Sequence, residues 1–255
     1  AQGIWVDKER TQVLTPDGLG VTVSLLHTGR HYPDDLADDG LIYHYPVTAR
    51  APERDAAEIA ATKAAANLRM PIFVITHNTE ADALRDVRKA WVATWDDSNS
   101  QFLVLFQDNP PDARTLPAVD SEPFQALQPR GRRHRGGSSA LRTAKFRFDV
   151  IQRYGSVCAV CGIRLLQTLD AVHIIPVEEQ GADDPRNGLV LCATHHRAFD
   201  AYAFTIQPAT HCIVSSEQHT LERLRISRGD LAHLALPPHI DALTWRWDQF
   251  ERGKH

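Results

Sequence analysis

Cys158-Ala-Val-Cys161 and, after thirty further residues, Cys192-Ala-Thr-His195 decide the fold of the second half of this chain. Two close ligand pairs separated by a loop are typical of a structural zinc site, where thiolates and an imidazole meet tetrahedrally. Such a metal contributes folding free energy directly to a small domain. The spacing therefore predicts a structural Zn²⁺ bound by Cys158, Cys161, Cys192 and His195; the alternative is a set of unrelated buried cysteines. Cys212 lies outside the pattern and is expected to be a core thiol.

A second pattern lies between the two ligand pairs and just beyond them. The chain reads Asp170-Ala-Val-His-Ile-Ile-Pro176, then Asp184-Pro-Arg-Asn-Gly188, and finally His195-His-Arg-Ala-Phe-Asp200. From about Tyr154 to Phe204 it resembles the HNH nuclease family, which has a strand–loop–strand–helix fold around a metal. His173, Asn187 and His196 stand in the order and spacing of the three signature residues of that family.

The resemblance gives each signature residue a role in phosphodiester hydrolysis. This reaction needs a base that activates water and a Lewis acid that stabilises the charge developing on the phosphate. His173 would be the general base, Asn187 would brace the loop that orients it and could also touch the metal, and His196 would hold a catalytic Mg²⁺ or Mn²⁺. Phosphate oxygens suit these two hard ions.

Helical spacing adds Asp200 to this expected site. Residues four apart share one face of a helix, so Asp200 would be the second metal ligand beside His196. Adjacent helical residues point about 100° apart, which lets His195 complete the zinc site while His196 faces the catalytic ion. The simpler alternatives are an ordinary strand histidine at His173 and, at Asp200, a carboxylate favoured by the helix dipole. The combined order of the residues favours the functional interpretation.

The position before the expected base departs from the family. Many HNH enzymes have Asp or His there as a metal ligand, whereas this chain has Val172. Asp170 lies three residues before His173, and on a regular strand an odd offset points to the opposite face. Asp170 is therefore expected to be structural, and the full ligand set of the catalytic metal stays open.

Residues 1–108 are expected to be mainly β-structure. Short runs rich in β-branched and aromatic residues predict strands, and an alanine-rich stretch from Pro52 to Arg69 predicts one helix. Many short strands with one early helix indicate a compact barrel. The predicted strands are Gly20–His27, Leu41–Tyr45, Pro71–Thr76, Lys89–Trp95 and Phe102–Phe106.

Within this first part, His27-Thr-Gly-Arg-His-Tyr-Pro-Asp-Asp35 followed by Asp39-Gly-Leu-Ile-Tyr-His-Tyr45 resembles the SRA family, barrel domains that flip out and read modified cytosine. The resemblance implies that Tyr32 and Tyr45 sandwich the flipped base. It also implies that Asp35 accepts a hydrogen bond from the exocyclic amine of cytosine. A polar turn and an ordinary strand aromatic are the simpler alternative.

Two departures from the SRA pattern concern the pocket. One extra residue separates Asp35 from Gly40, and Pro46-Val-Thr-Ala-Arg50 replaces the Gly/Ser-rich loop that helps to surround the modification in the family. The modified group preferred by this chain is therefore left open.

Residues 109–139 are dense in Pro, Gly, Arg and Ser without periodicity, which predicts a linker. The net charge is −4, but residues 1–128 carry 11 basic and 19 acidic side chains while residues 129–255 carry 17 and 13. No acid interrupts the basic stretch from Arg130 to Arg147. Such a stretch can neutralise DNA phosphates, although a solvated linker is the alternative. The expected contacts to the DNA backbone are Arg130, Arg132, Arg133 and Arg135.

Composition limits the class of protein. A chain of 255 residues that is 43% apolar and 24% charged is typical of a soluble globular protein of one or two domains. No apolar run is long enough to span a membrane, no signal segment is recognisable, and the C-x-x-C indicates a reducing, cytoplasmic compartment. The predicted class is α+β: an N-terminal SRA/PUA-like β-barrel over 1–108, a linker over 109–139, and a zinc-containing ββα-metal (HNH) nuclease domain with C-terminal helices over 140–255.

Together these features predict a modification-dependent, type IV-like restriction endonuclease. It would flip 5-methylcytosine or 5-hydroxymethylcytosine in double-stranded DNA and hydrolyse nearby phosphodiester bonds. One HNH centre handles one strand at a time, so a double-strand break predicts a homodimer. The alternatives are an HNH nuclease whose first domain reads unmodified sequence or another modification, a modified-DNA binding protein with an inert HNH domain, and a nicking or homing-type enzyme indifferent to methylation.

Overall fold

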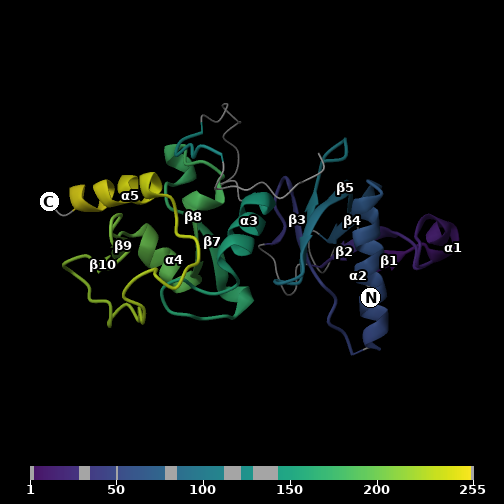
Figure 1. Cartoon of the computed structure of the whole chain (residues 1–255), viewed down its shortest axis with the longest axis horizontal. Helices are drawn as coiled ribbons and strands as arrows, with labels where there is room; N and C mark the ends of the chain where they lie inside the picture. Colours follow the sequence, from purple (N-terminus) through teal and green to yellow (C-terminus); the bar gives the residue numbers. More distant parts are fainter. Residues whose placement is uncertain are drawn as a thin grey trace. The chain divides into compact units, whose positions relative to one another are not determined.

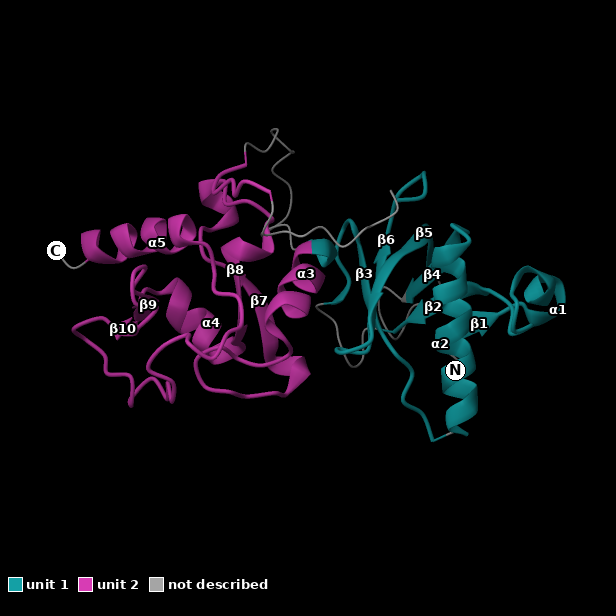
Figure 2. Cartoon of the chain, viewed as in Figure 1, with its two compact units in different colours: residues 1–117, 143–145 teal, residues 118–142, 146–255 magenta. Residues whose placement is uncertain are grey.

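The computed structural model describes residues 3–28, 35–49, 51–77, 85–111, 122–128 and 143–253 (Figure 1). The chain divides into two compact units (Figure 2). Unit 1 comprises residues 1–117 and 143–145, and unit 2 comprises residues 118–142 and 146–255. Both units mix helices and strands, in agreement with the predicted α+β class.

Unit 1 is built on one six-stranded sheet in the order β1-β2-β4-β5-β6-β3. β2 and β4 run parallel, and the other neighbouring pairs are antiparallel. Each of the five predicted strands coincides with one of these, whereas β1 and the short helices α1 (Lys8–Thr11) and η1 (Gln12–Leu14) were not predicted. The strands are β1 (Ile4–Val6), β2 (Thr22–His27), β3 (Gly40–His44), β4 (Ile72–His77), β5 (Arg85–Asp96) and β6 (Gln101–Leu105).

The long strand β5 connects the two halves of this sheet. Its first half pairs with β4 and its second half with β6, and a register shift between Val92 and Thr94 bends it. Among the described residues, β1 and β3 are the two edge strands and do not pair with each other, so the predicted closed barrel is not seen there. The sheet nevertheless curls, since the Tyr43 hydroxyl of β3 lies against Gly3, just before β1 at the other edge, where a Cβ atom would require the Tyr43 side chain to shift.

Helix α2 (Pro52–Asn67) covers one face of the sheet, as the alanine-rich stretch predicted. Pro52 is its first residue, where the missing N–H costs no hydrogen bond. The hydroxyl groups of Thr62 and Thr22 lie 2.8 Å apart and join the helix to β2. Small alanine side chains let α2 pack closely on an apolar core that includes Leu25, Ala65, Val74, Phe102 and Val104.

Unit 2 contains the strand–loop–strand–helix arrangement expected of its sequence. β7 (Leu169–His173) pairs antiparallel with β8 (Gly188–Cys192), and α4 (Ala193–Asp200) follows β8 directly and packs on both strands. The loop between the strands contains two short 3-10 helices, η5 (Val177–Glu179) and η6 (Pro185–Asn187). The remaining elements are α3 (Ala144–Tyr154), η4 (Leu166–Thr168), β9 (Phe204–Ile206), β10 (Ile213–Ser215) and α5 (Ile240–Arg252).

The C-terminal part of unit 2 differs from expectation in two respects. In the part of the chain that the structure describes, one helix, α5, stands where several closing helices were predicted. Arg246 fixes it: the guanidinium is buried, donates to the Phe199 carbonyl oxygen and stacks over the rings of Phe199 and Tyr202. Cys212 is exposed, so the prediction of a core thiol is wrong; it lies at a β-bridge to Asp230 at the surface.

Residues 122–128, inside the stretch predicted as linker, pack on unit 2. Leu127 forms a β-bridge with Gly181, and the Ala182 N–H donates to the Ala126 carbonyl oxygen. The Arg186 guanidinium donates to the Glu122 carbonyl oxygen at 2.9 Å. This segment therefore belongs to unit 2 and lines the loop between β7 and β8. Within the described ranges, no helix combines the length and apolarity needed to cross a membrane.

Candidate metal and catalytic sites

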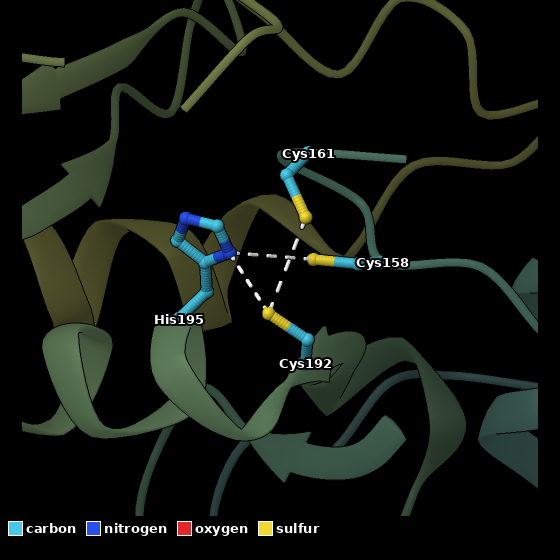
Figure 3. Close-up of side chains that lie close together, drawn as sticks. All are labelled: Cys158, Cys161, Cys192 and His195. Carbon is cyan, nitrogen blue, oxygen red and sulfur yellow. Dashed lines mark hydrogen bonds between the residues drawn. The ribbon is translucent and has the colours of Figure 1, made fainter. Parts of the chain in front are cut away.

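Four side chains from separate segments of unit 2 form a compact cluster (Figure 3). Cys158 and Cys161 lie in the turn after α3, Cys192 ends β8, and His195 lies near the start of α4. Their four ligand atoms lie within 4.8 Å of one another. His195 Nδ1 is 3.0 Å from Cys192 Sγ and 3.7 Å from Cys158 Sγ, and Cys161 Sγ is 4.0 Å from Cys192 Sγ.

These separations fit a tetrahedral metal ion. Metal–sulfur bonds of about 2.3 Å at tetrahedral angles place neighbouring ligand atoms about 3.8 Å apart. His195 Nε2 lies 3.0 Å from the Leu224 carbonyl oxygen, which can only accept a hydrogen bond. Nε2 therefore carries the proton, and Nδ1 presents its lone pair to the cysteines. The cluster could thus hold a metal ion through three sulfur atoms and one nitrogen, as the spacing predicted.

The turn that carries the first two cysteines is shaped by backbone hydrogen bonds. The Gly162 N–H donates to the Cys158 carbonyl oxygen at 2.9 Å, and the Cys158 N–H donates to the Ile163 carbonyl oxygen. Gly162 has φ +77°, a conformation that glycine adopts without strain. Both thiols of the C-x-x-C are thereby aimed at Cys192 and His195.

Without a metal, the two thiols of this turn differ in acidity. Burial raises the pKa of Cys158, but hydrogen bonds from His195 and from nearby backbone N–H groups outweigh it and lower the value to about 6. Burial raises the pKa of Cys161 to about 12. The hydrogen bond to Cys158 in turn raises the pKa of His195, against the effect of its own burial. Without a metal, a Cys158 thiolate paired with a protonated His195 ring is thus favoured.

His173, the predicted general base, is the last residue of β7. Its Nε2 lies 2.9 Å from Asp183 Oδ1, in the loop that follows. Its ring stacks on Phe146 of α3 with 3.6 Å between centroids and 8° between planes. The side chain is 14% exposed, so part of the ring reaches solvent. The sequence did not single out Asp183 or Phe146, because no spacing rule links a strand end to a loop ten residues later.

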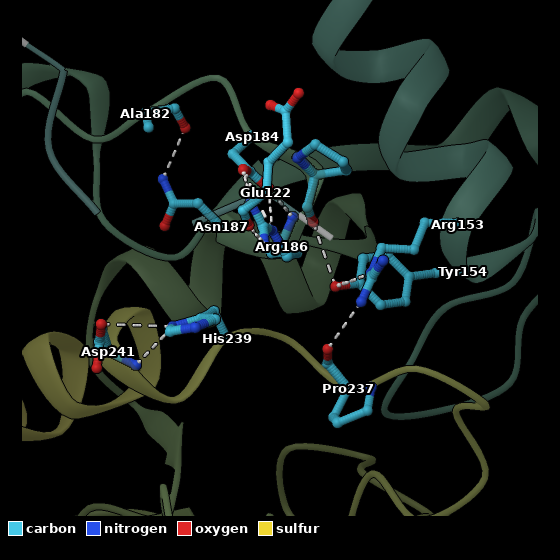
Figure 4. A network of polar contacts seen from close by, with 11 residues as sticks. Glu122, Arg153, Tyr154, Ala182, Asp184, Arg186, Asn187, Pro237, His239 and Asp241 are labelled. Carbon is cyan, nitrogen blue, oxygen red and sulfur yellow. Dashed lines mark hydrogen bonds and ion pairs between the residues drawn. The ribbon is translucent and has the colours of Figure 1, made fainter. Parts of the chain in front are cut away.

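Asn187, the second signature residue, is fully buried and its amide is occupied by the loop (Figure 4). Oδ1 accepts from the Ile175 N–H at 2.9 Å, and Nδ2 donates to the carbonyl oxygens of Ile175 and Ala182. The side chain therefore ties both ends of the loop between β7 and β8. With these three bonds made, both the amide oxygen and the amide nitrogen of Asn187 have protein partners.

Beside Asn187, a buried arginine secures the same loop (Figure 4). The Arg186 guanidinium pairs with the Asp184 carboxylate at 2.7 Å and stacks over the Phe124 ring. The Arg186 carbonyl oxygen accepts from the His239 N–H ahead of α5. The loop is thus held by an ion pair within it, by the stack on Phe124 and by the hydrogen bond to the segment ahead of α5.

His196 lies between two carboxylates. Its Nδ1 is 2.9 Å from Asp170 Oδ2 on β7, and its Nε2 is 3.3 Å from Asp200 Oδ2 one turn further along α4. Asp200 thus occupies the place expected from helical spacing. Asp170, expected to be structural, instead lies against His196. A neutral imidazole has one N–H, so donation to both carboxylates needs the doubly protonated ring, and a divalent cation between the ring and a carboxylate could take the place of one of these contacts.

In unit 1, Asp35 is almost fully buried and its carboxylate lies 2.7 Å from His44 Nε2 on β3. His27, at the end of β2, is close enough that the Asp35 charge acts on it, although burial is the larger effect and lowers the pKa of His27. Two histidines therefore surround the carboxylate that was expected to contact a base. Neither histidine was singled out from the sequence as a site residue.

Tyr45 belongs to a different environment. Its hydroxyl donates to Asp97 Oδ1 at 2.7 Å, and its ring lies 4.6 Å from that of Phe102. Consecutive residues of an extended strand point to opposite faces, so Tyr45 faces away from the His44 side chain. Burial, followed by the Asp97 hydrogen bond, raises the pKa of Tyr45. The remaining predicted contacts, Tyr32, Arg130, Arg132, Arg133 and Arg135, lie outside the described residues.

Residues 158–207 match the family model for an HNH endonuclease. None of the curated proteins matches the chain. Among solved structures, the chain is similar to a "Modification dependent TagI restriction endonuclease", with 18% identity over 97% of this chain and 84% of that one. The TM-score is 0.38, a value that does not show a shared fold. The chain contains an HNH endonuclease domain and is therefore a nuclease.

Proposed function

We propose that this HNH endonuclease cuts DNA, with His173 as general base and His196, Asp170 and Asp200 as the ligands of a catalytic divalent ion. The observation that carries the proposal is the placement of His196 between two carboxylates, 2.9 Å and 3.3 Å away, in a domain that matches the HNH model. One imidazole and two carboxylates are a ligand set suited to Mg²⁺ or Mn²⁺.

In this proposal each side chain has a separate task. His173 takes a proton from the attacking water, and Asn187 keeps the loop behind it in place. Asp170, His196 and Asp200 hold the cation, which supplies Lewis-acid stabilisation of the charge on the phosphate when it is bound. The ion in the cluster of Cys158, Cys161, Cys192 and His195 would be Zn²⁺ with a structural role, because thiolate-rich sites select it over harder cations.

We propose that unit 1 selects the target by reading modified cytosine. The support is the SRA-like pattern and the buried Asp35, whose carboxylate contacts His44 and could also accept a hydrogen bond from the exocyclic amine of cytosine, a donor that uracil and thymine lack at this position. Unpairing a base from the duplex would expose that amine. Tyr32 and Tyr45 remain the proposed stacking partners, and 5-methylcytosine and 5-hydroxymethylcytosine the proposed targets.

We propose two further features for the assembly on DNA. Arg130, Arg132, Arg133 and Arg135 would neutralise phosphates next to the nuclease unit and make binding sensitive to salt. A homodimer would place one HNH centre on each strand of the duplex. A monomeric mass in solution, both with and without modified DNA, would contradict the dimer.

Cleavage of one plasmid in three forms tests this function. The plasmid would be unmodified, 5-methylcytosine-containing or 5-hydroxymethylcytosine-containing, with Mg²⁺ or Mn²⁺ added to each reaction. Cutting confined to a modified form, abolished by His173→Ala and lost on modified DNA in Asp35→Ala, is the expected result. Equal cutting of all forms would keep the nuclease and discard the reader. Binding of modified DNA without any cutting would indicate an inert HNH domain.

A second candidate function keeps the nuclease and differs only in what unit 1 recognises on the DNA. Asp35 contacts His44, whereas the neighbouring Tyr45 turns its hydroxyl to Asp97, so the two expected pocket residues have different partners. This favours, as the alternative, an HNH nuclease whose first unit recognises unmodified sequence or another modification. In that case Tyr45→Ala would leave the choice of DNA target unchanged.

A further inference from the structure

The Asp183 carboxylate contacts the proposed base directly. Asp183 Oδ1 lies 2.9 Å from His173 Nε2, and the side chains are 29% and 14% exposed, respectively. The contact joins the end of β7 to the loop that leads to η6, a separation of ten residues. It is therefore made by the fold of the loop rather than by local chain geometry.

The chemistry of the pair fixes which nitrogen of His173 can act. An ionised carboxylate only accepts hydrogen bonds, so Nε2 must carry a proton and donate to Asp183. In the neutral ring, the lone pair then resides on Nδ1. No hydrogen bond to Nδ1 occurs within the described residues, and the side chain is partly open to solvent. The free nitrogen is thus the one available to take a proton from water.

Two further contacts hold the ring in this orientation. The Phe146 ring covers one face of the imidazole in a nearly parallel stack at 3.6 Å. Phe146 is itself buried in the core of unit 2, so this stacking surface is rigid. Together, a stack on one face and a hydrogen bond at one edge leave the imidazole little freedom to rotate or flip.

We propose that Asp183 is a positioning residue that selects the Nε2–H tautomer of His173 and stabilises the positive charge that His173 acquires when it takes a proton. The proposal deepens the proposed function and rests on His173 as the base. Loss of a carboxylate that orients a functional histidine often lowers activity by about 10- to 100-fold.

The loop that carries Asp183 is built to keep it there. Next to it, the Ala182 carbonyl oxygen accepts from Asn187 Nδ2 at 3.0 Å and the Ala182 N–H donates to Ala126. On the other side, Asp184 is paired with Arg186. Asp183 is thus flanked by two anchored residues, while its own carboxylate faces the histidine.

The first test compares Asp183→Ala with Glu179→Ala in the full chain. Glu179 is an exposed acid of the same loop, so its removal controls for the loss of one negative charge near DNA. Asp183→Ala should lower kcat by about 10- to 100-fold, with KM changed by less than about twofold. Asp183→Asn keeps an acceptor oxygen, so its kcat should lie between those of Asp183→Ala and the wild type. Glu179→Ala should cut at the wild-type rate. An unchanged kcat in Asp183→Ala would overturn the proposal.

A double-mutant cycle separates positioning from an independent role. If Asp183 acts only through His173, the variant lacking both side chains should be as slow as His173→Ala alone. A further loss in the double variant would overturn the proposal, because Asp183 would then act on the metal or the substrate itself.

The tautomer gives a readout that does not depend on cutting. Nitrogen-15 NMR of the histidines, assigned by comparison with His173→Ala, should show His173 protonated on Nε2 in the wild type and a mixture of tautomers in Asp183→Ala. The same mixture in both proteins would overturn the inference. An inactive wild type with the expected tautomer would instead refute the proposed nuclease function and leave the positioning by Asp183 intact.

Discussion

Two adjacent residues of α4, His195 and His196, lie in very different surroundings. His195 is buried and faces three cysteines, whereas His196 is partly exposed and faces two carboxylates. Sulfur-rich, closed sites hold zinc for structure, and oxygen-rich, open sites hold hard ions that must meet substrate. Neighbouring residues of one helix therefore face the proposed structural site and the proposed catalytic site, and substitutions on either side should have opposite signatures.

The largest effect is expected on the sulfur side. Cys192→Ser should remove the metal and with it the folded state of unit 2, because a structural zinc contributes about 10 to 16 kcal/mol and whole domains are stable by only about 5 to 15 kcal/mol. Metal analysis and thermal unfolding followed by circular dichroism measure both losses. Cys212→Ser, an exposed thiol outside the cluster, is the matched control and should leave both unchanged. If the metal-free protein unfolded at the wild-type temperature, the sulfur cluster would not stabilise unit 2 and the contrast with His196 would not hold.

The next effect is expected on the oxygen side. His196→Ala should lower DNA cleavage about a thousandfold, the equivalent of about 4 kcal/mol of lost transition-state stabilisation. The zinc content and the melting temperature should stay at wild-type values, because the side chain is outside the sulfur cluster. Thr194→Ala, at an exposed position of the same helix, serves as the control. A loss of zinc in His196→Ala would show that the two sites are not separable.

Asp170 and His196 should then depend on each other. Asp170→Asn should raise the Mg²⁺ concentration needed for half-maximal cleavage by about 10- to 100-fold, because a neutral oxygen replaces a carboxylate in contact with the imidazole. A titration of cleavage rate against Mg²⁺ measures this. Unchanged metal dependence would return Asp170 to the structural role expected from its place on the strand.

Asp200→Asn should have the smallest effect of the series. The Asp200 side chain is 59% exposed and lies 3.3 Å from His196, compared with 21% exposure and 2.9 Å for Asp170. Water can replace an exposed ligand, so we expect a rise of only a few-fold in the Mg²⁺ requirement. The order Asp170 before Asp200 is the critical result, and the reverse order would move the centre of the site toward the end of α4.

The success of prediction differed between local and long-range features. The helix α2 and the cluster of three cysteines and one histidine follow from composition and spacing within short stretches, and the β7–β8–α4 arrangement was implied by the resemblance to the HNH family. The closed barrel does not, since closure depends on how far a sheet curls, and here that involves a bulge in β5 and the approach of Tyr43 to Gly3. Such features arise from twist and register, which composition does not record.

The candidate site shows the same division. His173, Asn187 and His196 were predicted from the resemblance to the HNH family, and Asp200 from the repeat of a helix every 3.6 residues. Asp170 was predicted to be structural because its side chain points to the opposite face of the strand from that of His173. Its actual partner, His196, lies on α4, which follows the next strand. Asp183 and His44 could not be found, because their contacts depend on how a loop or a neighbouring segment returns to the strand.

The single peptide bond between His195 and His196 also has a consequence for oxidative conditions. Zinc-bound thiolates react with peroxide, which takes two electrons from two sulfurs and leaves a disulfide that no longer binds the ion. Cys161 is partly exposed and its sulfur already lies 4.0 Å from that of Cys192. Since the start of α4 is held through His195, the loss of that ion would also displace His196. The nuclease would then lose its activity under oxidising conditions and regain it when the thiols and the metal ion are restored.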